Sequence, residues 1–522
     1  MVGQPTDFWN QLGSNDADVE HLYGFLLERG TPANSRDLAV NLIEWRVHEE
    51  ERRLAEIAAR RAPVYQPKET YSVGQSILFT ALGNREGFVR RVRDADNPRL
   101  GLFQVIGVQF DDEPNLLEFA SSYAAPHPLN QEIAPTAITL DLTAEQAVET
   151  FADKVRGNLV QRLGADKEFV HLGDQWYLKG LLPEINPGYL NLAEAAVEQT
   201  GDAMTTGELL KILDLPETEK RSAMRFGLNL ALSHDARFED VGPMNETRWF
   251  LVRLEPPEAH ERPGILDANQ VRTVPLSSEL ETIADELVDK ADSVGNGHQS
   301  VAPRDEVTLI LTYPHRRAGT LPLTPLVRAL LPDFSHPRLR FTFVDATTEE
   351  KVAGYAVTEG NYLAGLTNWF ASRRLSPGAY ITLRRGPRPL TLIIEYQSQR
   401  ERSLWVRVAR GINGRLLFSQ EKRPLSHKYD EEMLIVVADP VGLDALARAQ
   451  AEQRNLQPLL DEVFPELAKL SSSGHVHAKT IFSAVNLVRR TGPRAVFSAL
   501  AESRSFASVG GGYFMLNEEA RR

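Results

Sequence analysis

One short pattern occurs three times in this chain of 522 residues and limits its fold more than any other feature. It consists of Phe, two further residues, Leu or Val, and Gly, then a polar turn, two aromatic residues and an aliphatic one. The copies begin at Phe169, Phe238 and Phe506 and end near residues 178, 251 and 516. Short apolar runs on either side of a Gly-containing turn are typical of an antiparallel hairpin. We therefore expect three small hairpins built alike.

Each copy follows a segment whose apolar residues have helical spacing, at 144–163, 217–232 and 493–500. Helices followed by a small hairpin is the element order of a winged helix, in which the last helix can enter a DNA groove. Internal repeats are the most informative feature to seek in a long chain. The sequence thus predicts three winged-helix units.

The middle copy resembles winged helices of the HARE-HTH type, which occur in the delta subunit of bacterial RNA polymerase and in restriction-associated proteins. The matching residues are Leu192 to Ala196 for the first helix, Thr205 to Leu210 for the second, Arg221 to Leu232 for the third and 238–251 for the wing. The C-terminal copy is similar from His477 to Leu516, and the first copy only in its third helix and wing. The resemblance implies a winged-helix fold and a role in binding DNA or docking on a transcription complex.

The composition is that of a globular protein, with 42% hydrophobic and 25% charged residues. The absence of cysteine excludes disulfides, a thiolate nucleophile and a Cys-ligated zinc. No apolar run approaches the roughly 20 residues that span a bilayer, and the first 15 residues lack the apolar core of a signal peptide. We therefore expect a cytoplasmic protein of a bacterium or archaeon.

The predicted fold class is α+β and multidomain, with three winged-helix units, a small β-barrel and a basic β-rich module. The expected domains are an N-terminal winged helix at 1–183 with a β-barrel at about 66–128 inserted in it or adjoining it, the middle winged helix at 184–254, a linker with an acidic helix at 255–305, the basic module at 306–438, and a helical segment with the C-terminal winged helix at 439–522.

Two further resemblances concern the β-rich parts. Residues 66–128 are similar to small SH3-like barrels of transcription-associated proteins, because Val73-Gly74 precedes an apolar strand. Residues 339–396 resemble B3-type DNA-binding pseudobarrels, with a strand, a Trp-Phe helix, a Leu-x-Pro-Gly turn and a basic tip. At the turn this chain has Ala379 where the family has Asp.

The charge is uneven along the chain, whose net charge is −13. Residues 313–428 contain 19 Lys and Arg against 8 Asp and Glu, a net +11. A basic module in an acidic chain favours a phosphate-binding surface there, and Arg pairs bidentately with phosphate or guanine. The alternative is a solvated or internally paired surface. The candidate contacts in this module are Arg373, Arg374, Arg384, Arg385 and Arg388.

The last helices of two winged units supply further candidate nucleic-acid contacts. Winged helices also serve as protein-docking units, and the acidic surroundings of the middle copy favour that alternative. The candidates are Lys220, Arg221 and Arg225 in the middle copy and Arg489, Arg490, Arg494 and Arg504 in the C-terminal one.

The aromatic residues of the repeat have two interpretations. They could stack on bases, but their periodic placement across a hairpin favours the hydrophobic core. The residues concerned are Phe169, Trp176, Phe238, Trp249, Phe506 and Tyr513.

Catalytic motifs are lacking: there is no phosphate-binding loop and no His-Glu-x-x-His helix. Asp345 with Glu395 and Gln397 is similar to a metal-dependent nuclease pattern, but Gln replaces the Lys that assists the attacking water. We therefore expect no enzyme, no cofactor and no metal. The leading hypothesis is a transcription- or nucleoid-associated protein that binds duplex DNA. The alternatives are a scaffold that docks on RNA polymerase or another complex, and a restriction-associated or nuclease-like subunit.

Overall fold

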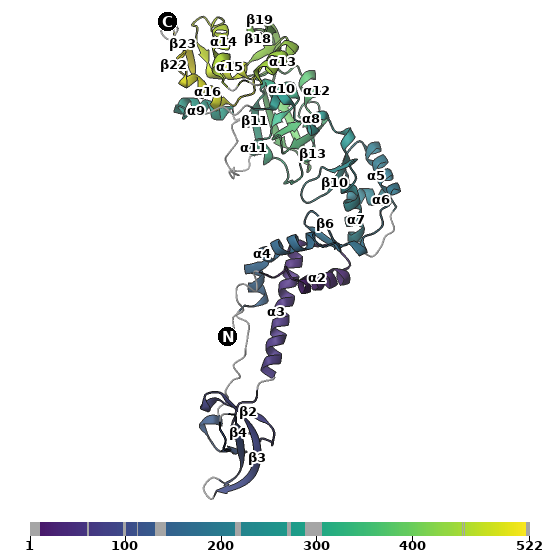
Figure 1. Ribbon diagram of the computed structural model, residues 1–522. Helices are drawn as coiled ribbons and strands as arrows, with labels where there is room; N and C mark the ends of the chain where they lie inside the picture. The colour runs from purple at the N-terminus through teal and green to yellow at the C-terminus, as the bar shows by residue number, and fades with distance from the viewer. Residues whose placement is uncertain are drawn as a thin grey trace. The chain divides into compact units, whose positions relative to one another are not determined.

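The computed structural model has an α+β fold with several compact parts (Figure 1). It describes residues 11–59, 62–97, 101–111, 113–130, 142–214, 221–268, 273–287, 305–451, 453 and 455–517. The chain divides into two compact units. The first comprises the residues up to Glu184 together with Glu217–Gly227, and the second comprises Ile185–Pro216 and Leu228 onward.

Three segments share one element order: a helix, a short strand, two helices and a hairpin. We call them the first, middle and C-terminal helix–hairpin units. In each, the short strand pairs antiparallel with the second hairpin strand, which gives the sheet orders β1-β7-β6, β8-β10-β9 and β21-β23-β22. Each repeat of the sequence forms an antiparallel hairpin, as its pattern predicts.

The first helix–hairpin unit has a core of Leu22, Leu42, Leu159 and Trp176. Its first helix ends where Gly30 takes the left-handed conformation at φ 60°, which a residue without Cβ adopts without strain. Its elements are α2 (Asp16–Arg29), β1 (Ala33–Asn34), α3 (Ser35–Ala59), α4 (Ala144–Gly164), β6 (Phe169–Leu172) and β7 (Gln175–Leu178).

A separate small sheet is formed by the chain between α3 and α4. Its antiparallel strands follow the order β2-β3-β4-β5 around an aromatic core that includes Tyr65 and Phe79. The segment before β2 forms backbone hydrogen bonds at both edges of this sheet. The Leu78 N–H donates to the Pro63 carbonyl at 2.9 Å, and the Tyr123 N–H donates to the Pro67 carbonyl at 2.8 Å. The strands are β2 (Ser76–Phe79), β3 (Arg85–Asn97), β4 (Gly101–Phe110) and β5 (Leu117–Ser121).

The middle helix–hairpin unit buries Leu209, Leu228, Phe238 and Trp249. Its second helix begins at a capping box, in which the Thr205 side chain and the Glu208 side chain each accept the other's backbone N–H. Its elements are α5 (Pro187–Thr200), β8 (Met204–Thr205), α6 (Thr206–Ile212), α7 (Arg221–Ser233), β9 (Phe238–Asp240) and β10 (Arg248–Leu251).

The expected linker at 255–305 is wrong for its first part, which is folded. Residues 257–266 include α8 (Pro257–His260), and Ala259 and Leu266 are buried there against Tyr355 and Tyr362. The Tyr362 hydroxyl also donates to the Glu258 carbonyl at 2.8 Å. The side chains of Ala259 and Leu266 thus anchor on the sheet a Pro-rich segment that composition alone assigns to a linker.

A seven-stranded sheet occupies residues 306–396, in the order β11-β16-β17-β13-β14-β15-β12. Neighbouring strands are antiparallel except β13 and β17. Phe343, Trp369 and Ile381 lie in its core. The strands are β11 (Glu306–Ile310), β12 (Leu321–Pro322), β13 (Arg338–Asp345), β14 (Lys351–Val357), β15 (Tyr362–Ala364), β16 (Tyr380–Arg385) and β17 (Thr391–Tyr396), and α10 (Tyr313–Ala318), α11 (Pro325–Arg328) and α12 (Thr367–Ser372) accompany them.

A long two-stranded ribbon follows, made of β18 (Ser398–Ile412) and β19 (Arg415–His427), with β20 (Ile435–Val437) parallel to β18. Ala409 and Phe418 of this ribbon lie in one core with Phe464 and Phe497 of the C-terminal unit. This core contains residues from both sides of residue 438, the position at which the sequence predicted the end of the basic module.

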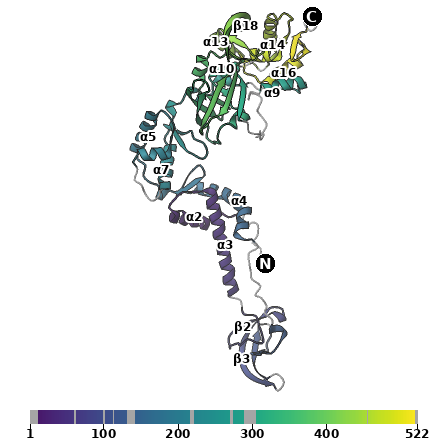
Figure 2. The same cartoon turned by 180° about the vertical axis from the view of Figure 1, so that it is seen from behind.

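The C-terminal helix–hairpin unit is covered by an acidic helix from an earlier part of the chain. This helix, α9 (Ser278–Glu286), lies along α16 in both views (Figures 1 and 2). No helix within the described residues has the length and apolarity needed to cross a bilayer. The remaining elements are α13 (Pro440–Gln450), α14 (Gln457–Ala468), β21 (Val476–His477), α15 (Ala478–Val485), α16 (Pro493–Glu502), β22 (Phe506–Gly510) and β23 (Tyr513–Leu516).

Candidate nucleic-acid interface

The five arginines predicted in the basic module do not form one surface of free cations. Arg373 follows α12 and pairs with Asp345 at 2.9 Å and with Glu350 at 2.8 Å. Burial opposes its charge, but these two carboxylates raise the pKa of Arg373 above its ordinary value. Arg384 pairs with Glu395 of the neighbouring strand at 2.7 Å. The internally paired alternative therefore applies to Arg373 and Arg384.

The other three arginines of this set are exposed. Arg385 ends β16 and donates to the Ala329 carbonyl at 2.6 Å. Arg388 lies in the turn between β16 and β17, and Arg374 has φ 50° in the turn after α12. No described residue forms an ion pair with Arg374 or Arg388. The side chains of Arg374 and Arg388 therefore remain available to a phosphate.

The arginines around α16 are mostly internal, which contradicts their prediction as groove contacts. Arg489 and Arg490 are buried, and Arg489 donates to the Asn455 carbonyl at 2.8 Å. Arg494 bonds to Glu281 at 3.1 Å and to Asp285, both on α9. The physical reason for Arg494 is that α9 covers the last helix of this unit, whereas Arg489 and Arg490 lie before that helix and contact Asn455 and His315. Of the four predicted residues only Arg504 is exposed, with no ion pair to a described residue.

The middle unit exposes Arg221 and Arg225 on α7, whereas Lys220 lies outside the described residues. Its hairpin is engaged within the protein. The Arg340 backbone N–H donates to the Val241 carbonyl at 2.9 Å, and Arg338 pairs with Glu239 at 2.5 Å. This hairpin docks on β13 and so is not a free wing.

The aromatic residues of the repeat are core residues in five of six positions, as expected. The exception is Tyr513, which is 37% exposed and whose hydroxyl donates to Glu432 at 2.9 Å. The buried members are Phe169, Trp176, Phe238, Trp249 and Phe506.

Among the described residues, the most exposed aromatic side chain lies elsewhere, on the β18–β19 ribbon. Trp405 is 65% exposed, whereas Trp176, Trp249 and Trp369 are buried. Lys422 is its cross-strand partner and holds its ammonium 5.5 Å from the centre of the indole ring. An exposed aromatic face beside a cation is a suitable surface for a nucleobase and its phosphate.

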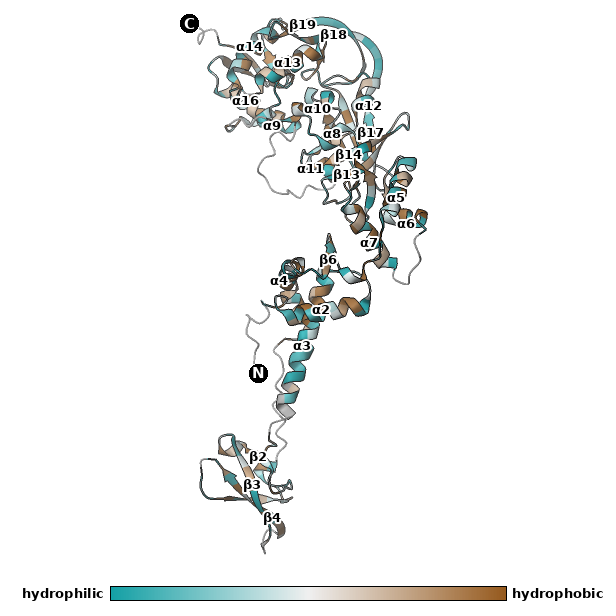
Figure 3. Ribbon diagram, turned by 45° about the vertical axis from the view of Figure 1, so that its right-hand side comes forward, coloured by the Kyte–Doolittle hydropathy of each residue, from teal (hydrophilic) through white to brown (hydrophobic). Residues whose placement is uncertain are grey.

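The ribbon around Trp405 carries an excess of positive charge. Residues 398–427 contain seven Lys and Arg but two Asp and Glu, and Figure 3 shows much of the ribbon in hydrophilic colours. One of the two acids, Glu421, is paired with both Arg410 and Arg423, and the bond from Arg410 is the main reason that the pKa of Glu421 is lowered. Arg400, Arg402 and Lys422 form no ion pair with any described residue. These cations stay uncompensated on the protein.

This site was not predicted from the sequence, although the strand itself contains the necessary indication. Leu404, Val406 and Val408 alternate with Trp405 and Arg407, and period-two alternation places Trp405 on the opposite face from the apolar residues. The structure agrees, because Val406 and Val408 are buried.

Comparisons with known proteins add no relative: no protein-family model, no curated protein and no solved structure matches the chain.

Proposed function

We propose that this chain is a non-enzymatic, cytoplasmic DNA-binding protein of the transcription or nucleoid class. Its main contact with duplex DNA is the β18–β19 ribbon, and the three helix–hairpin units are winged helices that serve mainly as framework. The observation that carries this proposal is the exposed Trp405 beside Lys422, on a ribbon with uncompensated cations.

The element order of the three units supports the winged-helix interpretation. In each unit a short strand directly precedes the second helix and pairs with the hairpin. This pairing closes a three-helix core. The units nevertheless offer little to a DNA groove. The C-terminal unit has its last helix under α9, and the middle unit has its hairpin on β13.

A two-stranded ribbon fits the major groove of B-DNA. The ribbon offers Arg400, Arg402 and Lys422 for phosphates and the face of Trp405 for a base or sugar. Phosphate contacts fix position without reading sequence. Affinity for duplex DNA is therefore expected to depend strongly on salt and weakly on sequence.

The test is fluorescence anisotropy of a labelled duplex with the full chain at several salt concentrations. The variant Arg400→Ala/Arg402→Ala/Lys422→Ala should bind more weakly, with a salt slope that is smaller by about 0.9 for each lost phosphate contact. The matched control removes three exposed lysines elsewhere: Lys68→Ala/Lys167→Ala/Lys179→Ala. An equal slope in the ribbon variant and in the wild type would refute the ribbon as the binding surface.

A second candidate function, a protein-docking scaffold, is favoured by an acidic cleft of about 660 Å³. Its walls come from α9, from the loop after β19 and from the C-terminal unit. Glu279 and Glu431 in these walls form no ion pair with a described residue, whereas Glu286 pairs with Lys479 and Glu432 with Arg407. Such a cleft suits a Lys- or Arg-rich segment of a partner protein. If the full chain binds an oligo-arginine peptide and not duplex DNA, and Glu279→Gln/Glu431→Gln weakens that binding, the scaffold function replaces the first proposal.

A further inference from the structure

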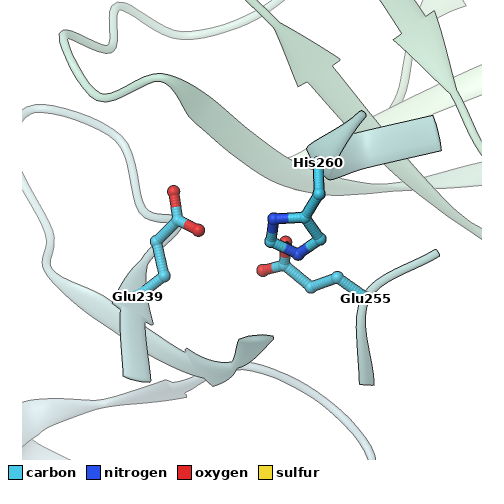
Figure 4. Close-up of side chains that lie close together, drawn as sticks. All are labelled: Glu239, Glu255 and His260. Carbon is cyan, nitrogen blue, oxygen red and sulfur yellow. The ribbon is translucent and has the colours of Figure 1, made fainter. Parts of the chain in front are cut away.

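We propose that Glu239, Glu255 and His260 form a binding site for one divalent transition-metal ion, with Zn²⁺ the best match. The three side chains come from different elements and converge (Figure 4). Glu239 lies in β9, Glu255 follows the turn after β10, and His260 ends α8. One ligand atom from each lies within 4.8 Å of the others.

Glu255 provides the observation that points to a ligand. Its side chain has no exposed surface, and neither carboxylate oxygen has a hydrogen-bond partner among the described residues. An unpartnered carboxylate in a protein interior is costly, and a cation at this point would remove the cost.

The contact between Glu255 and His260 has the same implication. The His260 Nε2 atom lies 2.8 Å from a Glu255 oxygen. The two atoms are close, yet His260 Nε2 has no hydrogen bond. An imidazole nitrogen and a carboxylate oxygen this close, with neither in a hydrogen bond to a described residue, can serve as two ligands of one cation.

The donor set decides the class of ion. One imidazole nitrogen and two carboxylate oxygens suit Zn²⁺, which is held by His, Asp and Glu in tetrahedral sites, with water as the fourth ligand. Ca²⁺ and Mg²⁺ prefer oxygen ligands alone.

Arg338 is compatible with this role because it orients the ligands. Its Nη1 bonds both oxygens of Glu239, at 2.5 and 2.6 Å, and its Nε donates to the Ala259 carbonyl at 2.7 Å, next to His260. Each carboxylate oxygen has a second lone pair for an ion. Partners of this kind fix ligands in many metal sites.

An ion at this point would join β9 of the middle unit to the segment 255–260. Both parts also contact the seven-stranded sheet, through Arg338 and through Tyr362. The expected consequence is a more stable junction, and this site is independent of the ribbon.

The test uses the full chain after removal of metal by a chelator. Calorimetry with Zn²⁺ should give one site per chain, and Co²⁺ should give the visible absorption of a tetrahedral centre. Glu255→Gln and His260→Gln should each weaken binding at least tenfold and abolish the rise in Tm with Zn²⁺. The control Glu261→Gln, at an exposed neighbour of His260, should behave as the wild type.

The result that would overturn the site is absence of stoichiometric binding in the wild type, or equal binding in the wild type and both variants. His260 is partly exposed, so His260→Gln tests the site even if Glu255→Gln fails to fold. Circular dichroism of each variant without metal separates these cases.

Discussion

Trp369 donates its indole N–H to the Asp345 carboxylate at 2.8 Å, within the core of the seven-stranded sheet. Arg373 donates to the same oxygen at 2.9 Å, and the backbone N–H groups of Thr347 and Thr348 donate to the other at 2.8 Å. Asp345 is 2% exposed. Asp345, which belongs to the nuclease-like pattern, therefore connects α12 to the end of β13. Both of its oxygens already accept hydrogen bonds from the protein.

The first prediction concerns Asp345→Asn. Burial alone would raise the pKa of Asp345, but the bonds from Thr348, Thr347 and Trp369 and the charge of Arg373 hold it below its ordinary value. A lowered pKa stabilises the fold above pH of about 4, and this contribution is lost as the pH falls through the folded value.

Asp345→Asn should therefore cost about 3 kcal/mol at pH 7, because it leaves Arg373 without its buried partner. The difference from the wild type should shrink below pH of about 4. Denaturant unfolding from pH 3 to 7, followed by tryptophan fluorescence, measures both. A difference that is constant over this range would show that the charge of Asp345 contributes nothing.

The second prediction separates core from surface tryptophans. Trp249 is buried and donates to Asn229 at 3.0 Å, so Trp249→Ala should cost roughly 3–5 kcal/mol. Trp405→Ala should leave the stability within about 0.5 kcal/mol, as usual for exposed positions, and weaken DNA binding instead. A large stability loss for Trp405→Ala and a small one for Trp249→Ala would contradict the burial of Trp249 and the exposure of Trp405.

The third prediction tests how α9 is held on the C-terminal unit. Leu280 lies in the core shared with Val496 and Phe497, so Leu280→Ala should cost roughly 2–5 kcal/mol. Arg494→Ala removes the ion pairs to Glu281 and Asp285, which are partly exposed. That variant should lose less than about 1 kcal/mol. Thermal unfolding of both variants gives the comparison, and a larger loss for Arg494→Ala would assign the docking of α9 to charge.

The hairpins and most helices could be predicted from the sequence because their causes are local. The repeat around Phe169, Phe238 and Phe506 encodes hairpins through apolar spacing, and Gly30 ends α2 through its own conformation. The partners of charged residues are set by the tertiary fold instead. Nothing near Arg494 in the sequence indicates Glu281, since the helix that carries it is more than 200 residues away.

The same limit applies to the candidate sites. The alternation of residues 404–408 is sufficient to predict that Trp405 is exposed, but clusters of arginine do not point to it. Glu239, Glu255 and His260 have no metal-ligand spacing, and only the docking of β9 near residues 255–260 brings them together. Residues 255–266 are rich in Glu and Pro, a composition typical of linkers, although this segment is folded.

The last prediction concerns the arginines at the tip of the seven-stranded sheet. Arg385 and Arg388 are exposed, whereas Arg384 is paired with Glu395. If the tip assists the ribbon, Arg385→Ala/Arg388→Ala should weaken binding of all duplex sequences alike and reduce the salt slope by up to about 1.8. Adding Arg384→Ala should change the slope little, because that guanidinium already has a carboxylate partner. Anisotropy at several salt concentrations gives the slopes. A further decrease of about 0.9 in the triple variant would show that DNA displaces Glu395 from Arg384, and the tip would then contact phosphate with all three arginines.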